Sequence, residues 1–257
     1  MNILAFFAHP DDETMLCGGT LALLARAGAQ VHLLIATRGE GGENGEPPVC
    51  SREELGEVRA EEMRCAAKQL GAASLRFLSY IDPLVGPDNT LYAFTEDEET
   101  LTAELVEALQ AVHAEALISH GSNGEYGHPA HRLCHRAARK AIERLGTQAP
   151  LFYTIQATHP EHPRVRLANP EDPAHLILDT QSVHDIKVAA ALCHRTQHAL
   201  FIRNTSRELG RPVTVPEVIR DWESLHRVYP PVHRLPVEDE LTNLLRATGS
   251  ARDPVET

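Results

Sequence analysis

NILAFFAHPDDE, residues 2–13, is the stretch of this 257-residue sequence that decides the fold. Its first half is a short apolar run bounded by proline and charge, which predicts a buried strand over Asn2–Ala8. His9, Asp11 and Asp12 follow directly, so they lie at the carboxyl end of that strand, where open α/β sheets bind ligands. Crowding an imidazole and two carboxylates is costly unless a cation neutralises them, which favours a divalent metal. A turn and helix start, with its acidic residues at the positive end of the helix dipole, also explains this pattern.

The alternation of strand and helix patterns continues through the first two thirds of the chain. Strands are predicted at Val31–Thr37, Leu75–Tyr80, Ala116–Ser119 and Leu151–Ala157, and helices at Glu13–Ala27, Ser51–Gly71, Glu96–His113 and Pro129–Leu145. This order predicts a Rossmann-like α/β fold, in which a mostly parallel sheet is flanked by helices on both faces. The metal site is expected at the C-terminal strand ends.

The rest of the chain has a less regular pattern. We expect a strand at Leu176–Leu178 and a helix at Val183–Ala199, whereas the tail from Val213 to Thr257 shows no pattern that places its elements. No Pro- or Ser-rich linker divides the chain. We therefore expect one domain over residues 1–257, with an α/β core over about 1–200 and a C-terminal extension over about 201–257.

Composition excludes several classes of protein. The net charge of −12 provides no basic footprint for nucleic acid. No stretch approaches the ~20 apolar residues that a membrane span needs. The five cysteines are odd in number and form no C-x-x-C motif, which favours reduced thiols and a cytoplasmic protein.

A second cluster, NGEYGHPAH at residues 123–131, follows the strand that ends at Ser119. Pro129 suits the first turn of a helix, so His128 and His131 lie three apart on one face. An isolated H-x-x-H is weak evidence in a chain with 15 histidines. With the first cluster it supplies two imidazoles and a carboxylate, and three protein ligands with an open fourth position are typical of catalytic zinc. Such ligands also suit Fe²⁺ and other divalent ions.

The two clusters together resemble a known enzyme family. AHPDDE at residues 8–13 with YGHPAH at residues 126–131 is similar to the zinc-dependent N-acetylglucosamine de-N-acetylases of the PIG-L/LmbE-like family. Three further segments extend the resemblance over roughly residues 1–200: TRGEGG at 37–42, LGEVRAEE at 55–62, and Lys187 with HRTQ at 194–197. It implies metal-dependent hydrolysis of the N-acetyl group of an N-acetylglucosaminyl conjugate, such as the malate or inositol conjugate of low-molecular-weight thiol biosynthesis.

The resemblance also implies roles for individual residues. Zn²⁺ would be held by His9, Asp12 and His131. Asp11 would act as general base for the attacking water, and Tyr126 would stabilise the oxyanion.

Further roles follow from the resemblance around these residues. His128 would stabilise charge or protonate the leaving amine, while Arg38 and His194 would bind substrate. Ala130 stands where the family often has Asp between the two histidines, which puts the support of the metal site in doubt. Arg59 and Glu62, three apart on a helix, are expected to form a surface ion pair.

Other functions remain open from the sequence. The protein could deacetylate a chito-oligosaccharide or another N-acyl metabolite, or it could be a Rossmann-like protein that binds metal or sugar without catalysis. Against binding of a nucleotide, two carboxylates after the first strand would repel a pyrophosphate. The expected partner is a small amino-sugar substrate, and a homo-oligomer is compatible with the sequence.

Overall fold

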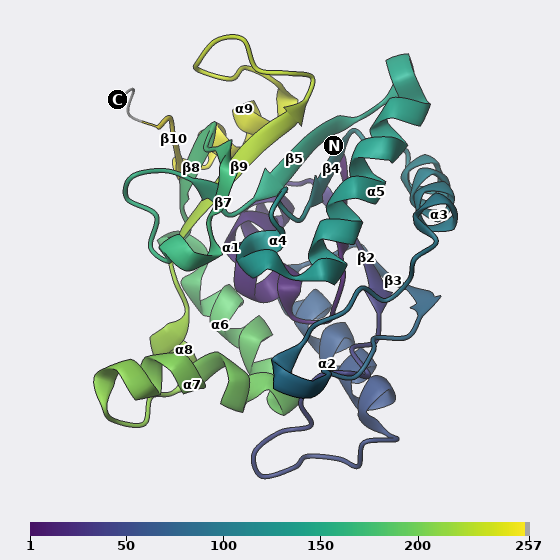
Figure 1. Cartoon of the computed structure of the whole chain (residues 1–257). Coiled ribbons are helices and arrows are strands. Elements are labelled where there is room, and N and C mark those ends of the chain that lie inside the picture. The colour runs from purple at the N-terminus through teal and green to yellow at the C-terminus, as the bar shows by residue number, and fades with distance from the viewer. Residues whose placement is uncertain (255–257) are drawn as a thin grey trace.

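Eight strands form the central sheet of the computed structural model, which describes residues 1–254 (Figure 1). In order across the sheet they are β10 (Ala251–Arg252), β8 (Leu176–Asp179), β9 (Trp222–Tyr229), β5 (Leu151–Ile155), β4 (Ala116–Ser119), β1 (Asn2–Phe7), β2 (Gln30–Thr37) and β3 (Ser74–Tyr80). The five strands from β3 to β5 are parallel, and β9, β8 and β10 continue the sheet in antiparallel pairs. The predicted Rossmann-like, mostly parallel sheet is therefore confirmed.

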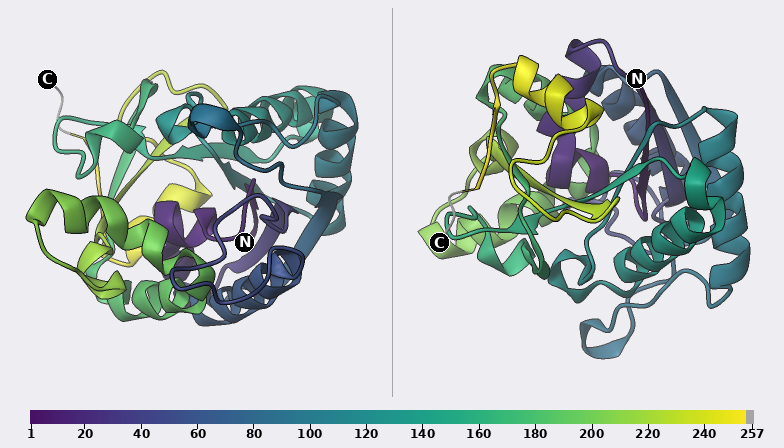
Figure 2. Two further views of the ribbon diagram at one scale, coloured as in Figure 1. Left: turned by 60° about the horizontal axis from the view of Figure 1, so that its bottom comes forward. Right: turned by 90° about the horizontal axis from the view of Figure 1, so that it is seen from above.

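Helices cover both faces of this sheet (Figures 1 and 2). They are α1 (Asp12–Arg26), α2 (Leu55–Leu70), α3 (Glu98–Ala111), α4 (Gly124–Gly127), α5 (Pro129–Leu145), α6 (His184–Cys193), α7 (His198–Leu209), α8 (Val215–Val218) and α9 (Glu240–Ala247). Alternate side chains of β1 point to opposite faces of the sheet. Ile3 and Phe7 pack with α1 and α2, whereas Leu4 and Phe6 pack with α3 and α5. Every helix within residues 1–254 is too short or too polar to cross a lipid bilayer.

A small second sheet lies beside the end of β5. It pairs β6 (Ala157–Thr158) with β7 (Asn169–Pro173) in parallel. Between these two strands runs the irregular segment 159–168, which includes a single 3₁₀ turn over Val165–Leu167. This segment forms one side of a cavity.

The predicted helix Val183–Ala199 is two helices in the structure. The chain leaves helical geometry at His194 (φ −81°, ψ 58°), makes a 3₁₀ turn over Arg195–Gln197 and resumes as α7. The buried carboxylate of Glu62 on α2 accepts hydrogen bonds from the Thr196 backbone N–H (2.9 Å) and hydroxyl (2.6 Å). This contact from a distant element stabilises the break, which helical periodicity alone could not reveal.

The expectation of reduced thiols is wrong for two cysteines. Cys65 of α2 and Cys193 at the end of α6 form a disulfide, while Cys17, Cys50 and Cys134 are free. The two bonded residues are 128 positions apart in sequence, so the pairing depends on how α2 packs against α6. This disulfide removes the argument from cysteine usage for a reducing compartment.

Candidate metal centre and active site

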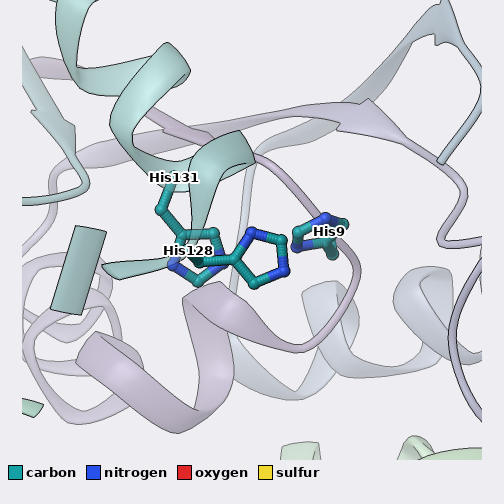
Figure 3. A group of neighbouring side chains, drawn as sticks. All are labelled: His9, His128 and His131. Atoms are coloured by element: carbon teal, nitrogen blue, oxygen red, sulfur yellow. The ribbon is translucent and has the colours of Figure 1, made fainter. Parts of the chain in front are cut away.

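The two sequence clusters meet at the carboxyl ends of β1 and β4. His9 follows β1, Asp12 begins α1 and His131 lies in the first turns of α5. Asp12 Oδ1 is 3.2 Å from His131 Nε2, and Asp12 Oδ2 is 3.2 Å from His9 Nδ1. Figure 3 shows the rings of His128 and His131, both from the start of α5, gathered with that of His9. The predicted convergence of these residues is therefore present in the structure.

The buried atom His131 Nε2 shows that the cluster fits a metal ion. It makes no hydrogen bond, although Asp12 Oδ1 lies 3.2 Å away, whereas His131 Nδ1 lies 2.6 Å from Glu125 Oε2. An imidazole that is oriented through one nitrogen and offers the other is the usual arrangement of a metal-binding histidine. Ligand atoms of His9, His128 and His131 lie within 4.8 Å of one another, and so do those of Asp12, His120 and His131. The donor set of imidazoles and one carboxylate suits a divalent transition metal.

The charged groups of the cluster shift one another's pKa. Burial alone would raise the pKa of Asp12, but the neighbouring imidazoles of His131, His120 and His9 hold it well below its usual range. Burial likewise opposes protonation of His9, yet Asp82 and Asp12 raise the pKa of its imidazole to about 9. These carboxylates therefore require positive charge beside them, which protons supply on the imidazoles and a divalent cation could supply in their place.

Glu125 is a buried residue of the site that the sequence analysis missed. Its Oε2 lies 3.0 Å from His120 Nδ1 as well as 2.6 Å from His131 Nδ1, and its Oε1 accepts from the Gly121 N–H. The backbone of Glu125 is strained, with φ 60° and ψ −77°. One carboxylate thus orients two imidazoles of the cluster. His120 could have been found by the same reasoning as His9, because it follows β4 directly.

His120 is less available to a metal than His131. Its Nε2 accepts a hydrogen bond from the Ala8 backbone N–H (3.1 Å), while Nδ1 faces Glu125. Both nitrogens of His120 are therefore engaged. This supports His120 as a link between β1 and β4.

Asp11 is held in a strained conformation beside the cluster. Its φ of 114° is rare for a residue other than glycine, and its backbone N–H donates to Glu13 Oε2 (3.0 Å). Burial raises the pKa of the Asp11 carboxyl to about 6, against the opposing effect of the Arg59 guanidinium. The carboxylate is therefore the main form at neutral pH and can accept a proton.

Arg59 is buried, so the expected surface ion pair with Glu62 is wrong. Its guanidinium donates to the carbonyls of Pro10 (2.5 Å) and Gly39 (2.9 Å) and lies 3.3 Å from Asp11 Oδ2. The signal was present in the sequence, because Arg59 is four residues from both Leu55 and Met63 on the buried face of α2. Arg59 thus joins the loop after β2 to the turn that carries Asp11.

Tyr126 and His128 lie at the edge of the cluster. The Tyr126 ring is half-exposed and makes edge contacts with the rings of His128 and His131, each at 5.6 Å between centroids. His128 caps α5, since its Nδ1 accepts from the Ala130 backbone N–H (3.2 Å). A backbone group of Ala130 therefore orients His128, although the side chain of Ala130 carries no carboxylate.

A cavity of about 700 Å³ opens over these residues. Its lining includes His9, Asp11, Asp12, Tyr126 and His128 from the cluster, Asp82 and Tyr92 from the segment after β3, Arg164 and Arg166 from segment 159–168, and Leu200 and Phe201 from α7. Asp82 Oδ1 is 3.3 Å from His9 Nε2, and its place directly after β3 is a signal that the sequence analysis did not use.

Arg38 and His194, both expected to bind substrate, do not line this cavity. The Arg38 guanidinium is directed to an ion pair with Glu57 at the surface. His194 is fully buried, with its Nε2 3.4 Å from Glu13 Oε1, so it packs against Glu13 instead of lining the cavity. The structure thus places neither residue for direct contact with a bound molecule.

Comparisons with known proteins find relatives over most of the chain. The family model for GlcNAc-PI de-N-acetylase (PIG-L) matches residues 4–142. The 1D-myo-inositol 2-acetamido-2-deoxy-alpha-D-glucopyranoside deacetylase of Rhodococcus opacus is 27% identical over 261 residues, covering 86% of this chain and 89% of its own length. The protein of the same name from Acidothermus cellulolyticus is 30% identical over 234 residues, covering 77% and 80%.

Solved structures share the fold at lower identity. The N,N'-diacetylchitobiose deacetylase of Pyrococcus horikoshii superposes with a TM-score of 0.62 at 18% identity, covering 88% of this chain and 83% of its own. The 4-carboxy-2-hydroxymuconate hydratase of Pseudomonas putida superposes with a TM-score of 0.59 at 24% identity, covering 91% and 98%. Because a hydratase and a deacetylase share this fold, the fold alone does not fix the reaction. The family match and the sequence relatives show that the chain belongs to the GlcNAc-PI de-N-acetylase (PIG-L) family.

Proposed function

We propose that this protein is a zinc-dependent hydrolase that removes the N-acetyl group of an N-acetylglucosaminyl conjugate. The observation that carries the proposal is the convergence of His9, Asp12 and His131 beneath a large cavity, with the buried His131 Nε2 facing Asp12 but making no hydrogen bond. Membership of a de-N-acetylase family supports the reaction type. Relatives named as deacetylases of an inositol conjugate make that conjugate the first candidate substrate.

In this proposal the metal ligands are His9, Asp12 and His131. Bound Zn²⁺ would supply a Lewis acid for the amide carbonyl and would lower the pKa of water. Glu125 holds the His131 ring in place through Nδ1, so that Nε2 faces Asp12. This leaves the protein to position the substrate and move protons.

Asp11 is the proposed general base. Its carboxylate lines the cavity beside Asp12 and, with a pKa of about 6, is unprotonated at neutral pH. It would take a proton from the attacking water and pass that proton to the departing amine, which balances the hydrolysis. The strained backbone of Asp11 and its contact with Arg59 hold the carboxylate in place for both transfers.

Tyr126 and His128 are proposed to stabilise charge in the transition state. Burial and the carboxylates of Asp12 and Asp11 raise the pKa of the Tyr126 hydroxyl, so it remains a donor to the developing oxyanion. Burial and neighbouring imidazoles lower the pKa of His128 to about 2, and its Nδ1 accepts from Ala130. His128 is therefore neutral and carries its proton on Nε2, where it can donate a hydrogen bond.

The experiment that tests this function is release of free amine from three conjugates, with added zinc and with a chelator. The conjugates are N-acetylglucosaminyl inositol, N-acetylglucosaminyl malate and diacetylchitobiose, which also covers the chito-oligosaccharide alternative. We expect chelator-sensitive release that zinc restores. Release that a chelator leaves unchanged would contradict the metal-dependent reaction, and bound zinc without release from any conjugate would favour a non-catalytic binding protein.

A further inference from the structure

Two arginines give the cavity a feature that the proposed reaction does not use. Arg164 and Arg166 lie in segment 159–168, outside the span matched by the family model. Both line the same cavity as His9, Asp11 and Asp12. The hydrolysis of an amide needs neither of them, so the proposed reaction assigns them no role.

The carboxylates that line the cavity already have cationic or imidazole partners. The pairs are Asp11 with Arg59 at 3.3 Å, Asp12 with His131 at 3.2 Å, Asp82 with His9 at 3.3 Å, and Glu43 with Arg203 at 2.7 Å. Little free negative charge therefore remains in the cavity to attract or neutralise a cation.

The two arginines are in the opposite situation. Neither forms an ion pair with a carboxylate within residues 1–254. The half-buried Arg164 donates one hydrogen bond from Nη2 to the Val218 carbonyl (2.7 Å), and Arg166 is exposed. A chain with a net charge of −12 has abundant carboxylates to pair with arginine. A third lining arginine, Arg52, also forms no ion pair within the described residues, but its Nη1 donates to the backbone carbonyls of Glu40 and Gly42. Arg164 and Arg166 are the two that lie together in one segment.

Other cations increase the positive charge at this place. Burial is the largest cause that lowers the pKa of Arg164, and the nearby charges of Arg220 and Arg166 act in the same direction, with Glu208 opposing. Guanidinium groups repel one another unless an anion lies between them. Arginine also matches the planar, bidentate geometry of carboxylate and phosphate groups better than lysine does.

We propose that Arg164 and Arg166 form a subsite for an acidic group, a carboxylate or a phosphate, on the aglycone of the substrate. This inference rests on the proposed function, because the N-acetylated sugar of the same substrate must bind at the metal cluster in this cavity. An acidic group would distinguish this chain's substrate from the uncharged inositol conjugate, which is the first candidate on the names of the relatives alone. The arginines act on specificity, and the reacting amide stays with Asp11 and the metal ligands.

The experiment compares three conjugates of N-acetylglucosamine. N-acetylglucosaminyl malate carries carboxylates, N-acetylglucosamine 1-phosphate carries a phosphate, and N-acetylglucosaminyl inositol is neutral. We expect a higher kcat/KM for at least one acidic conjugate than for the neutral one, and the preferred acid identifies the group. Because charge-assisted hydrogen bonds are strong, Arg164→Gln and Arg166→Gln should each lower kcat/KM for that conjugate by about 10- to 100-fold. The loss for the neutral conjugate should be at least tenfold smaller.

Arg139→Gln is the matched control, since Arg139 lies on the exposed face of α5 and its removal changes the net charge equally. Calorimetry with malate and with inorganic phosphate measures binding of an acidic group to the subsite without turnover. Equal losses for acidic and neutral conjugates, or no loss in either variant, would overturn the inference. If no conjugate releases amine, the proposed function fails, while the calorimetric comparison of wild type with the Arg164→Gln variant still decides whether the subsite exists.

Discussion

The floor and the rim of the cavity are built in different ways. The floor comes from residues at strand ends and helix starts within the first 131 positions, where His9, Asp12 and His131 converge. The rim comes from segment 159–168 and from α7, both of which lie in the less regular part of the chain. The comparison indicates that short motifs encode the floor, whereas the rim, which carries the proposed acidic-group subsite, depends on long-range packing.

Backbone strain marks the floor. Asp11 and Glu125 both have positive φ without being glycine, and each is adjacent to residues of the metal cluster. Such conformations cost about 1–3 kcal/mol each and persist where surrounding contacts hold them. Here those contacts are hydrogen bonds, from the Asp11 N–H to Glu13 and between the Glu125 side chain and two imidazoles. The floor is thus preorganised by the folded chain.

Replacing a floor ligand should have the largest effect. We expect His131→Ala to reduce metal affinity by more than about 100-fold, because loss of a ligand's outer partner alone costs about 10- to 100-fold. Metal content after dialysis, measured by elemental analysis with the amine-release assay, checks this. His233→Ala, which removes an exposed histidine, is the control. Full zinc occupancy in the His131→Ala variant would remove His131 from the ligand set.

Replacing the proposed base should separate catalysis from metal binding. Asp11→Asn keeps the size of the side chain but removes the proton acceptor, so we expect kcat to fall by about 10²–10⁴-fold. Metal content should stay at the wild-type level, since the ligands remain. Measuring kcat and bound metal on the same preparation tests both statements. An active Asp11→Asn variant would show that another group takes the proton.

The difference between floor and rim also explains what the sequence could predict. The strands, the parallel order and the meeting of His9 with His131 follow from local periodicity and from motifs at strand ends, and the structure agrees with them. The i,i+3 spacing of Arg59 and Glu62 predicts a surface pair, but both residues lie on the buried face of α2, which decides their position.

The rim was not predictable for a different reason. The break at His194 depends on Glu62, which is 134 residues away from Thr196, and β9 joins the sheet from a tail without clear periodicity. The cavity contacts of Arg164 and Arg166 arise from this long-range packing. Local sequence patterns do not encode contacts between such distant segments.

The Cys65–Cys193 disulfide should stabilise the structure beneath the rim. It joins α2 to the end of α6, directly before the turn and helix that supply Gln197, Leu200 and Phe201 to the cavity. A bond that closes so long a loop typically contributes about 2–4 kcal/mol. We therefore expect the Cys65→Ser/Cys193→Ser double variant to unfold at lower denaturant concentration, with Cys50→Ser as the control for a free cysteine. Identical unfolding curves with and without a reducing agent would contradict the prediction.

The smallest effect concerns the acid sensitivity of segment 159–168. His162 is buried there, its Nδ1 accepts from the Arg164 N–H (3.2 Å), and burial together with His159 lowers its pKa to about 4. In the unfolded chain this imidazole titrates near its ordinary value of 6.5. The unfolded state therefore binds the proton first, so the stabilisation from His162 is complete above about pH 6.5 and is lost as the pH falls toward 4.

A pKa lowered by this amount corresponds to roughly 3 kcal/mol, but solvent near the ring screens part of it, and we expect about 1 kcal/mol. The measurement is the free energy of unfolding by urea at about pH 7.5 and about pH 5, in a chelator so that metal release does not contribute. The wild type should have a higher free energy of unfolding than a His162→Gln variant at the higher pH, and this difference should be smaller by about 1 kcal/mol at the lower pH. A His233→Gln variant, which removes an exposed histidine, is the control. Parallel pH curves for wild type and His162→Gln would show that the rim's acid sensitivity has its origin in other residues.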